Sequence, residues 1–129
     1  MSRATIVKEE ISEKNIRLLA IYLETKNAVL VLLSEGEDQL GTLAASVPPT
    51  TEIQIKSFMS SVLLGDRNTT TARMLAERLA SKTGKIGLVS VHLRTVSETE
   101  ASSVLVKLFE KITTASQTGQ RLEGESIST

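Results

Sequence analysis

The clearest structural pattern of the chain lies in residues 63–93, LLGDRNTTTARMLAERLASKTGKIGLVSVHL. In the middle of this stretch, apolar residues recur at spacings of three and four, which places them on one face of an amphipathic helix: Ala72, Leu75, Ala76, Leu79 and Ala80. Gly84 follows this stripe, where a residue in the left-handed conformation commonly ends a helix. The apolar run from Ile86 to Leu93 then predicts a strand. The stretch therefore predicts a turn, a helix and a strand, in that order.

A turn and a strand precede this helix. Gly65 to Asn68 has the composition of a turn, and residues 69–71 are all threonine. We therefore expect a threonine hydroxyl to accept an N–H group of the first helical turn. Upstream, Ile53 to Leu64 predicts a strand. It follows Pro48-Pro49, which ends the previous strand because proline cannot donate to a β ladder.

A second helix is predicted downstream. Ser97 and Glu100 have the spacing of a capping box, in which each side chain binds a backbone N–H of the first turn. One face of this helix is apolar and carries Ala101, Val104, Leu105, Leu108, Phe109 and Ile112. Beyond Thr113 the periodicity fades into Ser, Thr, Gly, Gln and Glu. We expect a folded domain at residues 1–114 and a disordered tail at 115–129.

The first part of the chain predicts strands that are apolar on both faces. Ile16 to Glu24 and Ala28 to Ser34 are separated by Lys26-Asn27, and apolar residues occupy consecutive positions in both. Successive side chains of a strand point to opposite faces, so both faces of this sheet must be covered. The helices of the chain cover one face. The other face must be covered by a second sheet layer or by another protein molecule, which is a first indication of a dimer.

The next segment predicts a hairpin. Gly36-Glu37-Asp38 forms a polar turn, and Gln39 to Val47 returns as a strand, so we expect it to pair with Ala28 to Ser34. Gly41 inside the returning strand indicates a bulge or a close backbone approach. Together these elements predict a single α+β domain, with a mainly antiparallel β-sheet and two principal α-helices.

Composition excludes several functional classes. The 129 residues include no cysteine and 2% aromatic residues, and 15 basic residues balance 15 acidic ones. Thiolate metal sites and disulfides are therefore impossible, aromatic stacking on nucleic-acid bases is disfavoured, and no excess positive charge attracts nucleic acid or membrane. Arg73, Arg78, Lys82 and Lys85 fit a solvated helix face better than a phosphate site, because Glu77 lies among them.

The sequence offers no convincing catalytic or metal site. His92 is the single histidine, and a metal would need Glu98 and Glu100 as further ligands. We favour a half-exposed strand histidine, since no spacing typical of metal ligands surrounds it. No GxSxG motif supports a serine nucleophile, and Gly84-Lys85 lacks the other residues of a phosphate-binding loop. We predict that the protein is not an enzyme and needs no cofactor.

Two observations favour a cytoplasmic protein. Lys8, Glu9 and Glu10 interrupt the stretch in which a signal peptide needs continuous apolar residues. The longest apolar runs, Leu18 to Leu23 and Ala28 to Leu33, are far shorter than the roughly 20 residues of a membrane-spanning helix.

One segment resembles a known family. Leu63-Leu64-Gly65-Asp66, the threonine-rich turn and Leu75 to Thr83 resemble the signature of the proteasome assembly chaperone 4 family, and Val89-Ser90 and Leu93 extend the match. Ala28 to Ser34 and Gly41-Thr42-Leu43 are similar to the related chaperone 3. The resemblance implies a small α+β protein that acts as a dimer, with itself or with a chaperone 3-like protein. It also implies that the dimer holds proteasome α subunits while the α ring of the 20S particle assembles, without ATP or metal.

Two interpretations of the signature remain open. In the first, residues on or beside the polar face of the helix contact a partner: Arg73, Met74, Glu77 and Arg78. In the second, the signature is structural and shapes the turn and the helix through Leu63, Leu64, Gly65, Asp66, Leu75, Ala76 and Leu79. The alternative function is a small dimeric interaction scaffold of the roadblock or longin type. Such scaffolds usually place a helix before or among their early strands, whereas this chain begins with consecutive strands.

Overall fold

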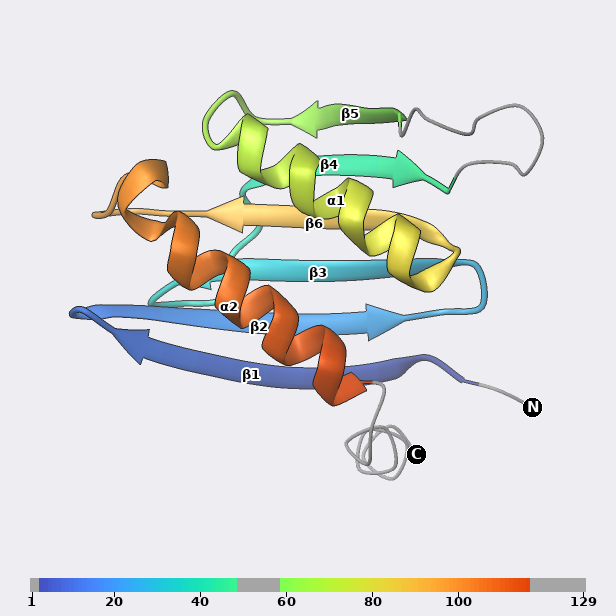
Figure 1. The fold of residues 1–129 in the computed structure, drawn as a ribbon, viewed down its shortest axis with the longest axis horizontal. Helices are drawn as coiled ribbons and strands as arrows, with labels where there is room; N and C mark the ends of the chain where they lie inside the picture. The colour runs from blue at the N-terminus through green and yellow to red at the C-terminus, as the bar shows by residue number, and fades with distance from the viewer. Residues whose placement is uncertain (1–2, 49–58, 117–129) are drawn as a thin grey trace.

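The computed structural model describes residues 3–48 and 59–116. Along the chain the elements are β1 (Thr5–Glu13), β2 (Ile16–Glu24), β3 (Ala28–Glu35), β4 (Thr42–Val47), β5 (Met59–Leu64), α1 (Thr69–Thr83), β6 (Ile86–His92) and α2 (Glu98–Ser116). They form one α+β domain in which both helices lie in front of a single sheet (Figure 1). The predicted fold class is confirmed.

The sheet has six strands in the order β1-β2-β3-β6-β4-β5. β3 and β6 are parallel, and every other neighbouring pair is antiparallel. The helix α1 connects β5 to β6 and carries the chain back over the sheet. As a result, β6 lies between β3 and β4, which both precede it in the sequence (Figure 1). The sheet is thus mainly antiparallel, as predicted.

The predicted hairpin of β3 and β4 is wrong. Instead, β6 lies between them. It pairs with β3 in parallel, where Ile86 lies opposite Ala28, and with β4 antiparallel, where Val91 lies opposite Thr42. The connection at residues 36–41 is longer than the two-residue loop of a tight hairpin, so it spans the intervening strand. A strand as apolar as β6 is best covered in the middle of a sheet, and this preference overrides the pairing of consecutive strands.

Gly41 makes the close backbone approach that its position predicted. A Cβ atom there would lie 2.3 Å from the carbonyl oxygen of Val91 and 2.8 Å from Cα of His92. The Gly41 N–H donates to Oγ of Ser90 at 2.8 Å, and Ser90 is fully buried. A polar residue is therefore accommodated in the covered part of β6, because its hydroxyl binds the neighbouring backbone.

The start of α1 differs from the predicted threonine cap. Asn68 occupies the N-cap position with φ 61° and makes no side-chain cap hydrogen bond. Instead, Oε2 of Glu98, the first residue of α2, accepts the Thr71 N–H at 2.9 Å and the Thr71 hydroxyl at 2.5 Å. The other end agrees with the prediction, since Gly84 has φ 69° and donates its N–H to the Ala80 carbonyl.

The capping box of α2 is confirmed. The Ser97 N–H donates to Oε1 of Glu100 at 2.9 Å, and the Glu100 N–H donates to Oγ of Ser97 at 3.1 Å. The helix continues to Ser116, beyond Thr113, where the apolar periodicity of the sequence fades. Residues 117–129 of the predicted tail, and residues 53–58 of the strand predicted before the first helix, lie outside the described residues.

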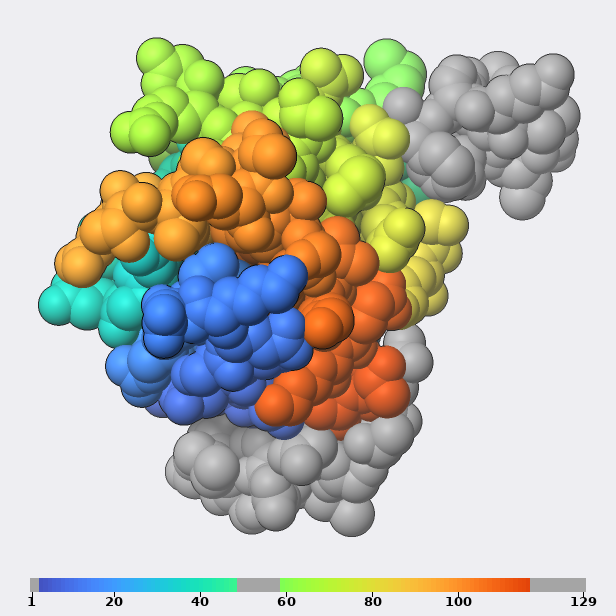
Figure 2. Space-filling view, turned by 60° about the vertical axis from the view of Figure 1, so that its left-hand side comes forward, coloured from blue at the N-terminus to red at the C-terminus, as the bar shows by residue number. Residues whose placement is uncertain are grey.

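The core lies between the helices and one face of the sheet. Helix α1 packs on β4 and β6, and α2 packs on β1 and β2. Figure 2 shows α2 against the hairpin of β1 and β2. Every apolar helix position predicted from the periodicity is fully buried. The strands contribute their alternate side chains to this core: Leu18, Ala20, Tyr22, Val29, Val31, Leu33, Val89 and Val91.

Candidate protein interaction surfaces

The face of the sheet opposite the helices is aliphatic, and within the described residues neither helix covers it. We name it the open face; its half-buried residues are Leu19, Ile21, Leu23, Leu30, Leu32, Leu43, Ala45 and Leu88. The register makes it continuous, because Leu23 lies beside Leu30, Leu30 beside Leu88, and Leu88 beside Ala45. Four adjacent strands therefore present one apolar surface.

The open face reaches the β5 edge of the sheet, where large apolar side chains are about half to two thirds exposed. Val47 and Met59 lie opposite each other and are 60% and 68% exposed. Leu63 and Leu64 are 54% and 49% exposed. Contiguous apolar surface of this kind marks interaction sites on soluble proteins. The strands that are apolar on both faces are thus covered by the described helices on one face only.

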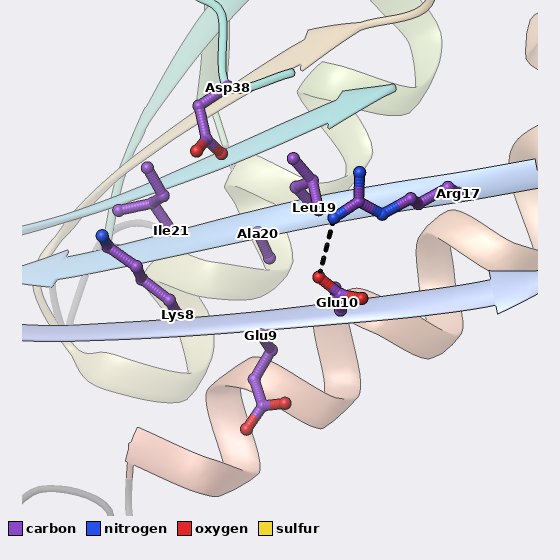
Figure 3. A pocket seen from close by; sticks show the side chains of 8 residues that line it. All are labelled: Lys8, Glu9, Glu10, Arg17, Leu19, Ala20, Ile21 and Asp38. Atoms are coloured by element: carbon purple, nitrogen blue, oxygen red, sulfur yellow. Dashed lines mark hydrogen bonds and ion pairs between the residues drawn. The ribbon is translucent and has the colours of Figure 1, made fainter. Parts of the chain in front are cut away.

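A shallow hollow of about 380 Å³ lies at the β1 end of the open face (Figure 3). Its lining comes from β1, β2 and the connection after β3: Lys8, Glu9, Glu10, Arg17, Leu19, Ala20, Ile21 and Asp38. Nη2 of Arg17 donates to Oε1 of Glu10 at 3.2 Å, between two side chains that are both 56% exposed. Small-molecule sites are deeper and mostly apolar, so this hollow is better described as a charged margin of the open face.

The four residues predicted to contact a partner lie along α1, but their contacts differ. Arg73 and Met74 are exposed, and Glu77 is half-buried. Nε of Arg73 donates to Oγ of Ser60 at 3.1 Å, and the Ser60 hydroxyl donates to Oε2 of Glu77 at 2.5 Å. Arg73 and Glu77, which lie one helical turn apart, are therefore bridged by Ser60 of β5.

Arg78 is turned toward α2. Its Nη1 donates to Oε2 of Glu110 at 2.9 Å, and Nζ of Lys82 donates to Oε1 of the same carboxylate at 2.9 Å. The hydrogen bond from Lys82 lowers the pKa of Glu110; burial opposes this shift, and Arg78 adds to it. Arg78 thus ties the two helices together, which leaves Arg73 and Met74 as the freer part of the predicted site.

The signature residues divide between core and surface. Leu75, Ala76 and Leu79 are fully buried on the face of α1 that packs against the sheet. Gly65 has φ 89°, and a Cβ atom there would lie 2.5 Å from Oγ1 of Thr42. Asp66, by contrast, is exposed together with Leu63 and Leu64.

The residues considered as metal ligands have other roles. Glu98 binds Thr71 and Glu100 belongs to the capping box. The described part of the chain contains no group of three His, Cys, Asp or Glu side chains that could hold a metal. Nε2 of His92 is buried and finds no hydrogen-bond partner among these residues.

Sequence reasoning missed Glu35, which is 8% exposed at the end of β3. Its Oε1 accepts the N–H groups of Arg94, Thr95 and Val96, and its Oε2 accepts the Thr95 hydroxyl. Burial alone would raise the pKa of Glu35, but these hydrogen bonds outweigh it and lower the pKa to about 2. The carboxylate holds the loop that leads from β6 into α2. Its hydrogen-bond partners are about 60 residues away in sequence, so no local sequence motif could predict the role of Glu35.

The charged margin was also missed, because Lys8, Arg17 and Asp38 belong to three separate segments that meet only in the folded sheet. Neither helix of the described chain is long and apolar enough to cross a membrane.

The comparisons with known proteins concern the fold. No protein-family model matches the chain, and no curated protein matches it. Among solved structures, it is similar to a chain in the crystal structure of a novel chaperone complex for yeast 20S proteasome assembly. The two share 12% sequence identity with a TM-score of 0.64, over 88% of this chain and 95% of that chain. The chain therefore has the fold of a protein in that yeast chaperone complex.

Proposed function

We propose that this protein is a non-catalytic, cytoplasmic chaperone of proteasome assembly, which dimerises and binds proteasome α subunits while the α ring of the 20S particle forms. The observation that carries the proposal is the open face, an aliphatic sheet surface that the described helices leave uncovered. The likeness in fold to a chain of the yeast chaperone complex and the signature at residues 63–93 both support it.

The whole side of the sheet that carries the open face, with its margins on β1 and β5, approaches the size of a dimer interface. Six strands spaced about 4.8 Å apart span about 24 Å, and strands of 6 to 9 residues span about 20–30 Å at about 3.3 Å per residue. The projected area is therefore about 500–700 Å². Standard protein interfaces bury about 800 Å² on each partner, so this face supplies most of one. We assign dimerisation to it, with a second copy or a chaperone 3-like protein as the partner.

The client surface is assigned to α1, on the opposite side of the molecule. Arg73, Met74, Glu77 and Arg78 lie on this helix, and Met74 is 43% exposed between charged neighbours. An apolar side chain among charges is typical of the boundary of a transient interface. Because the open face and α1 lie on opposite sides of the sheet, a dimer leaves both copies of α1 accessible (Figure 1).

A role without catalysis agrees with how the acidic groups are used. Glu35 holds a loop, Glu98 caps α1, and Glu110 joins the two helices. Each of these three carboxylates is engaged by backbone, hydroxyl or basic groups of the fold. Binding of proteins requires no cofactor.

The proposal is tested by purifying the tagged chain from its own cells and identifying bound proteins by mass spectrometry. We expect proteasome α subunits with the unaltered chain. The double variant Arg73→Glu, Met74→Glu should recover at least about tenfold less of them, with an unchanged melting curve. Lys26→Glu, an exposed charge reversal in the turn after β2, is the matched control and should bind normally.

Two results would contradict the proposal. Recovery of other proteins in stoichiometric amounts without any α subunit would favour the roadblock or longin type of scaffold. Undiminished recovery of α subunits by the double variant would remove the client surface from α1 and leave the rest of the proposal in place.

A further inference from the structure

We infer that an extended segment of the client protein adds to the outer edge of β5 as a further strand of the sheet, with Arg73 and Met74 of α1 beside it. This inference rests on the client-binding half of the proposed function. It specifies how the client is held, through backbone hydrogen bonds at a sheet edge as well as through side chains of α1.

The two edges of the sheet differ in charge. β1 forms one edge and carries Lys8, Glu9, Glu10 and Glu13, and charges on an edge strand discourage pairing with another chain. β5 forms the other edge and reads MSSVLL, without a charge or a proline. In the part of the chain that the structure describes, no strand pairs with its outer side. β5 is therefore the edge that is unprotected against strand addition.

The side chains of β5 are too exposed for an edge that stays bare. Met59 and Leu64 lie opposite Val47 and Leu43 on the open-face side of the strand, and they are 68% and 49% exposed. The register with β4 is regular from Met59 to Val62, and the bulge follows it. This regular stretch presents alternate backbone groups outward, and an added strand would place an apolar side chain against Met59.

The other side of β5 is flanked by α1 and carries an unmatched charge. Arg73 contacts β5 through its Nε bond to Ser60, and no carboxylate of the described chain forms an ion pair with it. Glu77 is engaged by the same serine. An acidic side chain on the added strand would pair with the Arg73 guanidinium. The segment recognised is thus extended, with apolar residues on one side and an acidic residue on the other.

Hydrogen exchange of the complete chain tests the inference directly. The chain is measured alone and in the complex with α subunits recovered from its own cells. Strand addition should slow exchange of the outward amides of β5 at least about tenfold in the complex, whereas contacts by side chains alone leave these amides unprotected. The amides at the β1 edge serve as the internal reference.

A matched pair of edge variants provides an independent measurement. Ser61→Lys places a charge on β5, and Ser12→Lys places the same charge on β1; both serines are exposed on edge strands. Ser61→Lys should recover at least about tenfold less α subunit, and Ser12→Lys should bind normally. The mass of each variant in solution shows whether dimerisation is unchanged. If a variant no longer dimerises, the hydrogen-exchange measurement on the unaltered chain decides whether the β5 edge binds the client.

Three results would overturn the inference. If the β5 amides exchange equally fast with and without bound α subunit, the edge is not used, while the proposed function stands. If they are already slow in the purified chain and speed up on dilution, a second copy occupies the edge. If the unaltered chain recovers no α subunit, the proposed function fails and the client strand with it.

Discussion

Glu35 shows how a single buried carboxylate organises a distant loop. It accepts backbone N–H groups from three consecutive residues and a hydroxyl from one of them, all at the start of the connection into α2. A carboxylate can accept all of these at once, whereas a carboxamide would turn its NH₂ group toward some of them. The loop therefore depends on the ionised form of Glu35.

This dependence predicts a change of stability with pH. Because the pKa of Glu35 is lowered to about 2 from 4.5, its contribution is complete above pH 4.5 and is lost as the pH falls toward 2. Glu35→Gln should lower the free energy of unfolding by about 1–3 kcal/mol at pH 7. Urea unfolding of both proteins at pH 7, 4.5 and 3 should show the difference shrinking at low pH. A difference that stays constant would assign the loss to packing instead.

Gly41 predicts a second effect at the residue scale. In Gly41→Ala the new Cβ atom meets the Val91 carbonyl, which is backbone and cannot turn away. We expect a loss of about 2–4 kcal/mol, comparable to other severe core substitutions. Gly36→Ala is the comparison: nothing lies within 4 Å there, and only its φ of 81° is unfavourable, so about 1 kcal/mol is expected. Thermal unfolding of both variants measures the contrast, and equal losses would contradict it.

At the scale of elements, the two helices begin in different ways. The first turn of α2 is capped locally by Ser97 and Glu100, and a sequence pattern of four residues is sufficient to predict it. The first turn of α1 is capped by Glu98 of the other helix, and the threonines that were expected to cap it lie inside the helix. Helix α1 thus reaches its full stability only after α2 has docked.

Removing this contact should destabilise α1 from outside. Glu98→Ala leaves the Thr71 N–H and hydroxyl without their acceptor, so we expect a loss of about 1–2 kcal/mol, the usual effect of deleting a helix cap. Thr99→Ala, at the exposed neighbouring position, should change stability by less than about 0.5 kcal/mol. Chemical denaturation of both variants compares them. Equal stability of the two would show that water replaces the carboxylate at no cost.

At the scale of the whole molecule, the sheet has one face covered by its own helices and one aliphatic face that the described helices leave uncovered. Leu32→Glu places a charge in the middle of the open face, opposite Ile21 of β2. Burying an unpaired carboxylate in an interface is unfavourable, so the variant should be monomeric at concentrations where the unaltered chain is dimeric. Analytical ultracentrifugation measures this, with Ser102→Glu on the exposed side of α2 as the control. A monomeric unaltered chain would contradict the assignment of the open face.

Local patterns explain what could be predicted. The apolar stripes of α1 and α2, the capping box, Gly84 at the helix end and the close approach at Gly41 depend on residues within one or two turns of each other, or on the size of one side chain. Such features are encoded by backbone conformation and side-chain periodicity, which act over a few residues. The apolar residues on both faces of β2 and β3 likewise predicted an apolar sheet surface beyond the one that the helices cover.

Local sequence patterns were therefore sufficient to predict the kinds of elements, the caps at α2 and at the end of α1, and a sheet too apolar for one layer of helices. Four features became visible only in the folded chain: β6 separates β3 from β4, Glu98 caps the other helix, Glu35 holds a loop about 60 residues away, and the uncharged strand β5 forms an edge of the described sheet. These features depend on which strands become neighbours. That choice minimises exposed apolar surface over the whole chain, and no short segment contains it.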